Sequence, residues 1–141
     1  MEQYMQKIAN LESIGVKFTE LLKQVGIENQ EQLLARCGPR KERQALAKQL
    51  GINAKLLLKW TQQADLARIS GIGDDYAELL LQVRIDSVPA LAQSNSKKLL
   101  SHMQQINEQN NLVKKLPNVT HLESWIEQAK NLPALVERDL F

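Results

Sequence analysis

The chain has 141 residues, with 18 Lys and Arg against 16 Asp and Glu, and a single cysteine, Cys37. This length suffices for one domain with its own hydrophobic core, and one cysteine excludes an intramolecular disulfide. Because only His102 and His121 accompany Cys37, no zinc-site spacing is present, and we expect neither a metal nor another cofactor. Residues 1–7 lack a signal-peptide pattern, and no segment has the roughly 18 apolar residues of a membrane span, which predicts a soluble cytoplasmic protein without membrane contact.

An internal repeat organises the chain. Residues 11–22 recur, diverged, 58 residues later as residues 69–80. The matched pairs include Gly15 with Gly73, Phe18 with Tyr76, Glu20 with Glu78, Leu22 with Leu80, Ile27 with Ile85 and Leu33 with Leu91. Such self-similarity indicates one supersecondary unit used twice. Apolar residues recur at helical spacing and no run alternates like a strand, so we expect an all-α protein.

The first copy begins with a helix whose apolar face includes Phe18, Leu22 and Val25. Gly26 is placed to end this helix in a left-handed cap, and Asn29 is placed to cap the short helix that follows. Pro39 opens a further helix, Gly51 closes it, and Asn53 caps the next one, which carries Trp60 and Ala64.

The second copy repeats this order. Ser87 caps a short helix with Pro89 in its first turn, and residues 96–113 form a Gln/Asn-rich helix. Pro117 then interrupts the helical pattern. Thr120 and Glu123 match a capping box ahead of Trp125 and Ala129. These last two residues match Trp60 and Ala64 at an offset of 65, and both tryptophans are expected to be buried core anchors.

No linker separates the copies, which we place at residues 10–66 and 67–132 of a single domain over residues 1–141. Because one copy of this length would leave its apolar face exposed, the two copies are expected to pack as a pseudo-symmetric bundle that unfolds cooperatively.

The segment Gly71-Ile72-Gly73 resembles the turn of the helix-hairpin-helix module, a grip on nucleic-acid backbones that does not read sequence. Glycines in such a turn permit positive φ and let a phosphate approach the amides of the helix N-terminus, while Ile72 fills the core between the helices. Asp74 and Asp75, however, would repel a phosphate here.

The first copy has Ser13 in place of the first glycine, but it keeps Gly15 and adds Lys17. This makes it the better phosphate candidate of the two. The alternative is that both segments are simply tight turns between helices.

The whole pattern of two hairpins, each followed by a helical extension ending in Trp-x-x-x-Ala, looks like a helix-hairpin-helix family of bacteria and archaea known only as a domain of unknown function. The resemblance covers about residues 10–132. It implies a compact tandem helix-hairpin-helix bundle with helical extensions, possible nucleic-acid binding by analogy, and no known enzymatic reaction.

Charge is unevenly distributed along the chain. Residues 36–59 carry seven cations and one acid, whereas residues 60–94 have a balance of −3. Arg36, Arg40, Lys41 and Arg43 lie near a predicted helix start and form a candidate phosphate-binding surface. The alternatives are a solvated helix face or a surface for an acidic protein partner, because no aromatic residue interleaves with these cations to stack bases.

Nothing in the sequence predicts an enzyme. Asp74 and Asp75 are adjacent and therefore do not share a helix face, and no nucleophile or nucleotide-binding signature is present. His102 and His121 are expected to be exposed.

The leading hypothesis is a non-catalytic domain that binds nucleic-acid backbone through Gly15, Lys17, Gly71, Gly73 and the four cations; the alternative is a protein-interaction adaptor. The sequence leaves open DNA, RNA or protein as ligand, and the oligomeric state.

Overall fold

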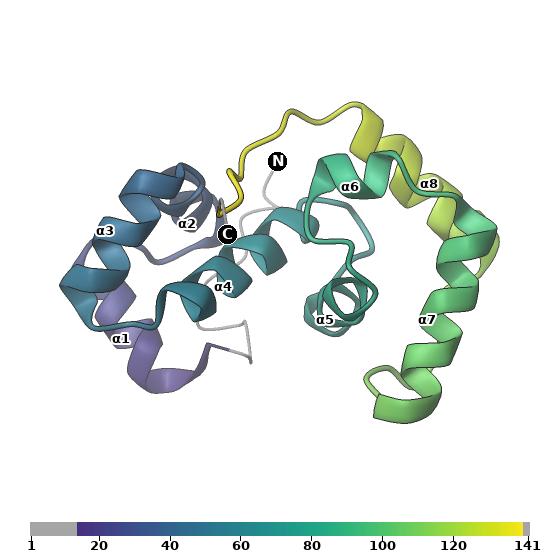
Figure 1. Ribbon diagram of the computed structural model, residues 1–141, viewed down its shortest axis with the longest axis horizontal. Helices are drawn as coiled ribbons and strands as arrows, with labels where there is room; N and C mark the ends of the chain where they lie inside the picture. The colour runs from purple at the N-terminus through teal and green to yellow at the C-terminus, as the bar shows by residue number, and fades with distance from the viewer. Residues whose placement is uncertain (1–13, 140–141) are drawn as a thin grey trace. The chain divides into compact units, whose positions relative to one another are not determined.

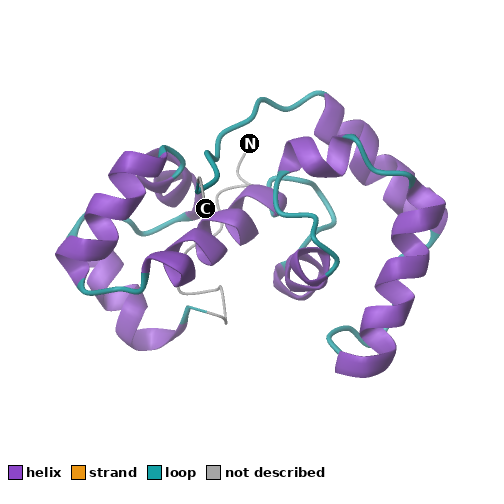
Figure 2. Cartoon of the chain, in the orientation of Figure 1, coloured by secondary structure: helices purple, strands orange, loops and turns teal. Residues whose placement is uncertain are grey.

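The computed structural model describes residues 14–139, which form α-helices and connecting turns without a β-strand (Figures 1 and 2). In chain order the helices are α1 (Gly15–Gln24), α2 (Gln30–Cys37), α3 (Arg40–Leu50), α4 (Ala54–Leu66), α5 (Asp74–Gln82), α6 (Val88–Ala92), α7 (Ser96–Asn110) and α8 (Val119–Lys130). The predicted all-α fold is confirmed.

The described residues divide into two compact units. The first unit contains residues 14–65 and 135–139, and the second contains Leu66–Ala134. The hydrophobic cluster of the first unit draws on α1 to α4, and that of the second unit draws on α5 to α8 and the turn before α5. We expect these two units to form a single domain that unfolds cooperatively, and this expectation stays a prediction.

The helices α1 and α5 end in the same way. In each, a backbone N–H after the helix donates to the carbonyl five residues earlier: Ile27 to Leu22 at 3.0 Å and Ile85 to Leu80 at 2.9 Å. The residue before this donor has positive φ, +83° at Gly26 and +70° at Arg84. The predicted left-handed cap at Gly26 is confirmed, and Arg84 adopts the same conformation although it is not a glycine.

The capping residues of the short helices α2 and α6 are also confirmed. The side chain of Asn29 accepts a hydrogen bond from the Gln32 N–H at 2.8 Å, and the Ser87 hydroxyl accepts one from the Ala90 N–H at 3.2 Å. Pro89 lies in the first turn of α6, where a helix needs no backbone donor.

The predicted boundaries of α3 and the start of α4 are confirmed as well. Pro39 immediately precedes α3, and Gly51 follows it with φ +69°. The Asn53 side chain accepts hydrogen bonds from the N–H groups of Lys55 and Leu56 at 2.9 and 3.3 Å, which caps α4.

Two boundaries in the second unit differ from prediction. The capping box of Thr120 and Glu123 is wrong: Asn118 is the N-cap, its side chain accepts from the His121 N–H at 2.8 Å, and Thr120 lies inside α8. The helix predicted over residues 96–113 ends at Asn110, because Asn111 turns the chain into the left-handed conformation with φ +49°.

Each unit contains one tilted aromatic pair. The ring centroids of Phe18 and Trp60 lie 5.1 Å apart at 55°, and those of Tyr76 and Trp125 lie 5.4 Å apart at 56°. Trp60 is 1% exposed and Trp125 is 4% exposed, so the prediction of two core anchors is confirmed. The matching pairs show that the two sets of four helices pack their aromatic residues alike.

Candidate functional site

The turn before α5 brings together the residues of the second predicted hairpin. Gly71 has φ +101°, the side chain of Ile72 is buried, and Gly73 is the N-cap of α5. A Cβ placed on Gly71 would lie 2.8 Å from Nε1 of Trp125, so this glycine accommodates the indole ring. A Cβ on Gly73 would have no neighbour within 4 Å among the described atoms, and its backbone is therefore the more open of the two.

The first turn of α5 is acidic, as the sequence requires. Asp74 and Asp75 both lie there, and Asp75 is exposed. Carboxylates at a helix N-terminus are stabilised by the helix dipole, and they compete with any other anion for that position.

The turn before α1 has the opposite character. Gly15 has φ +78°, a Cβ on it would have no neighbour within 4 Å among the described atoms, and Lys17 is exposed. The first turn of α1 contains no acid, and Ile14, the N-cap, offers no side-chain acceptor to its amides. Ser13, which replaces the first glycine of the hairpin, lies outside the described residues.

The four cations of the candidate phosphate-binding surface do not lie in equivalent environments. Arg36 and Lys41 are exposed, and Arg40 is partly buried. The Arg36 guanidinium donates to the carbonyl of Val25 at 3.2 Å, which ties it to the end of α1. The Arg40 guanidinium donates to the carbonyl of Arg138 at 3.2 Å. Arg36 and Lys41 remain at the exposed surface of the first unit.

Arg43 is placed differently, in the interior of the first unit, where it is 1% exposed. Its guanidinium donates to the carbonyls of Cys37 at 2.8 Å, Gly38 at 3.1 Å and Glu137 at 2.7 Å, and to the carboxylate of Asp139 at 3.0 Å. While these partners are in place, Arg43 has no access to an external phosphate. Arg43 is therefore removed from the candidate phosphate-binding surface.

The partners of Arg43 reveal a feature that sequence reasoning missed, the docking of residues Leu135–Asp139 on the turn between α2 and α3. The N–H of Glu137 donates to the carbonyl of Gly38 at 2.8 Å, and Val136 packs on the hydrophobic cluster of the first unit. The only sequence signal was the pair of acids, Glu137 and Asp139, after Pro133.

Cys37, His102 and His121 are the side chains with potential for nucleophilic or acid–base chemistry. Cys37 is buried, and burial raises the pKa of its thiol to about 11 from 9.0, which keeps it in the unreactive thiol form at neutral pH. His102 and His121 are exposed, as predicted. Among residues 14–139 there is no group of three or more potential metal ligands.

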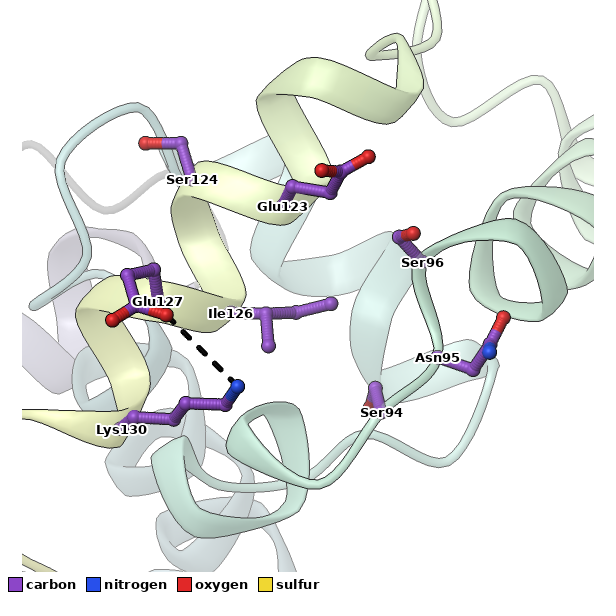
Figure 3. A pocket seen from close by; sticks show the side chains of 8 residues that line it. All are labelled: Ser94, Asn95, Ser96, Glu123, Ser124, Ile126, Glu127 and Lys130. Carbon is purple, nitrogen blue, oxygen red and sulfur yellow. Dashed lines mark ion pairs between the residues drawn. The ribbon is translucent and has the colours of Figure 1, made fainter.

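A shallow groove of about 570 Å³ lies on the second unit between the start of α7 and α8. Figure 3 shows Ser94, Asn95 and Ser96 along one side, and Glu123, Ser124, Ile126, Glu127 and Lys130 along the other. Glu127 and Lys130 lie 3.9 Å apart as an exposed ion pair. The two carboxylates in its wall make this groove unsuited to phosphate.

These features define the chain as an all-helical protein built from two units with matching helix ends and aromatic pairs. Its family follows from comparison: a family described as "Domain of unknown function (DUF4332)" matches residues 12–132, and the chain belongs to this family. Neither the curated proteins nor the solved structures contain a match to the chain. No helix among residues 14–139 is long and apolar enough to cross a membrane.

Proposed function

We propose that this protein is a non-catalytic helix-hairpin-helix protein that binds nucleic-acid backbone without reading sequence, and that the first unit makes the contact. The observation that carries the proposal is the start of α1. There, a glycine, Gly15, with no neighbour to its Cβ position within 4 Å among residues 14–139, an N-cap, Ile14, whose side chain accepts no hydrogen bond, and the exposed Lys17 occur together. Helix N-terminal amides and a nearby ammonium group are the two features that favour a phosphate.

The distribution of charge supports the first unit over the second. Among the described residues, the first unit has ten Lys and Arg against seven Asp and Glu, whereas the second has seven of each. The exposed cations Arg36 and Lys41 add to the field that would attract a polyanion. The acidic start of α5 makes the second hairpin a structural turn in this proposal.

The test is a salt titration of binding to duplex and single-stranded oligonucleotides. Replacing Lys17 with Glu should weaken binding to duplex DNA and flatten the salt dependence, because each lost phosphate contact removes about 0.9 from the slope of log affinity against log salt. Lys98→Glu, an equal charge reversal at an exposed residue of α7, is the matched control and should preserve the slope.

Two further outcomes bear on the proposal. Asp75→Lys should strengthen binding of the oligonucleotide only if the second hairpin also faces the nucleic-acid backbone. Absence of affinity in about 50 mM salt, where electrostatic binding is strong, would reject the nucleic-acid function. The second candidate function, a protein-interaction adaptor, would then take its place, and the docked acidic segment Leu135–Asp139 is the observation that favours it.

A further inference from the structure

The turn between α2 and α3 contacts the chain's own segment Leu135–Asp139, which lies outside the helices. The main chain of this segment makes three hydrogen bonds: Glu137 N–H donates to Gly38 at 2.8 Å, Arg43 donates to the Glu137 carbonyl at 2.7 Å, and Arg40 donates to the Arg138 carbonyl at 3.2 Å. Hydrogen bonds to the main chain of the segment do not depend on the identity of its side chains.

Two carboxylates give the site its chemical preference. The Glu137 carboxylate accepts from the backbone N–H of Arg40 at 3.1 Å, in the first turn of α3. The Asp139 carboxylate accepts from the Arg43 guanidinium at 3.0 Å and from the Gln44 amide at 3.3 Å. The two acids bound here, Glu137 and Asp139, are spaced two residues apart.

Shape and apolar contact complete the site. A Cβ on Gly38 would overlap the carbonyl oxygen of Leu135, so glycine is required for the segment to lie this close. Val136 packs on the hydrophobic cluster of the first unit. We call Gly38, Arg40, Arg43 and Gln44 the peptide dock.

The resident segment is separate in sequence from the unit that it contacts. It belongs to the first unit, but it follows all of the second unit in the chain and is joined to it at Ala134, an exposed residue. Every contact that it makes with the dock is one that another extended segment with the same acids can make. Only the covalent connection favours the resident segment, by raising its local concentration.

We propose that the peptide dock is a binding site for a protein partner that presents an extended segment of the form aliphatic-acid-x-acid, and that this segment enters by displacing Leu135–Asp139. The cationic dock and the acidic occupant are complementary in charge, and the resident segment defines the binding geometry. The proposal concerns a protein ligand and does not depend on binding of nucleic acid at α1.

The test uses the full chain and a fluorescently labelled synthetic peptide with the sequence of residues 134–139. In the variant Glu137→Gln/Asp139→Asn, the resident segment loses both carboxylates while the dock stays intact. The peptide should bind this variant about tenfold or more tightly than it binds the wild-type chain, since charged hydrogen bonds of the resident competitor are lost.

Two controls isolate the docking geometry. The chain variant Glu20→Gln/Glu28→Gln has the same change in net charge at exposed residues of the first unit, and it should bind the peptide as weakly as the wild type does. A peptide of identical composition, with its two acids adjacent, should bind the Glu137→Gln/Asp139→Asn chain about tenfold or more weakly than the native order does. Circular dichroism checks that each chain variant remains folded.

Several results would overturn the proposal. They are equal binding of the two peptides, equal binding to the two chain variants, or no binding to the Glu137→Gln/Asp139→Asn chain. Reversible dimerisation of the wild-type chain in sedimentation experiments, abolished in that variant, would instead identify a second copy of this chain as the occupant and overturn the proposed partner.

Discussion

At the scale of single residues, Arg43 joins two segments of the first unit that are far apart in the sequence. It is buried, and its guanidinium connects the turn between α2 and α3 to Glu137 and Asp139. Arg43→Met should lower the free energy of unfolding by about 3–5 kcal/mol, because removing one partner leaves buried polar groups unsatisfied. Urea denaturation measures this loss.

The control for this prediction is Lys41→Met, an equal change of charge at an exposed neighbour in the same helix, which should alter stability by no more than about 0.5 kcal/mol. Equal effects of the two substitutions would show that Arg43 contributes only surface charge.

The two glycines of the second hairpin, Gly71 and Gly73, are predicted to differ in how much an alanine substitution destabilises the protein. Gly71→Ala introduces a Cβ at φ +101° and 2.8 Å from Nε1 of Trp125, and should destabilise the protein by about 1–3 kcal/mol. Gly73→Ala meets no neighbour within 4 Å of the described atoms and has φ −93°, so it should be tolerated. Thermal unfolding of the two variants gives the comparison, and a destabilised Gly73→Ala with an unaffected Gly71→Ala would contradict the packing role of Gly71.

At the scale of helices, the ends of α1 and α5 offer a reciprocal test. Gly26 and Arg84 share the left-handed conformation, which costs a side-chain-bearing residue about 1–2 kcal/mol. Arg84→Gly should therefore raise the melting temperature, and Gly26→Ala should lower it. Arg84→Ala removes the same charge as Arg84→Gly but keeps the Cβ, so it should not raise the melting temperature. An increase equal to that of Arg84→Gly would show that loss of charge, and not relief of backbone strain, causes the effect.

Helix ends were also where sequence reasoning succeeded and failed most clearly. Asn29, Ser87 and Asn53 were predictable because a capping side chain acts on amides two or three residues away, so the signal is local. The start of α8 was misjudged because Thr120 and Glu123 have the spacing of a capping box, although Asn118 is the better N-cap residue and takes the position.

The partners of Arg43 were not predictable from its neighbours. Helical spacing places Arg43, unlike Lys41, on the same face of α3 as the buried Leu46 and Ala47. Its partners Glu137 and Asp139, however, lie 94 and 96 residues further along the chain. The Gly71–Trp125 approach is non-local for the same reason. The sequence could predict the repeat and the core anchors, but the environment of each cation required the tertiary fold.

At the scale of the whole molecule, the two units should unfold together. The first unit includes residues that follow the second unit in the sequence, so the chain passes between the units twice. We therefore expect unfolding of one unit to destabilise the other. Each unit holds one tryptophan, Trp60 or Trp125. Single-tryptophan variants, Trp125→Phe and Trp60→Phe, report on each unit by fluorescence.

Each single-tryptophan variant is compared with circular dichroism of the same protein, so that the substitution itself is controlled. Coincident urea transitions by both probes in both variants are expected for one cooperative unit. A fluorescence transition that precedes the loss of helicity in either variant would show that the chain consists of two independent domains.

The single thiol gives the first unit a kinetic reporter. Cys37 is fully buried, and its backbone carbonyl accepts a hydrogen bond from Arg43. A thiol reagent reaches it only during transient opening, so the alkylation rate measures how often this interior is exposed to solvent. Because the same opening disturbs the Arg43 network, labelling of the Glu137→Gln/Asp139→Asn chain should be faster than that of the wild type. Equal alkylation rates would mean that the thiol becomes exposed without release of Leu135–Asp139. The alkylation rate would then carry no information on the lifetime of the docked segment.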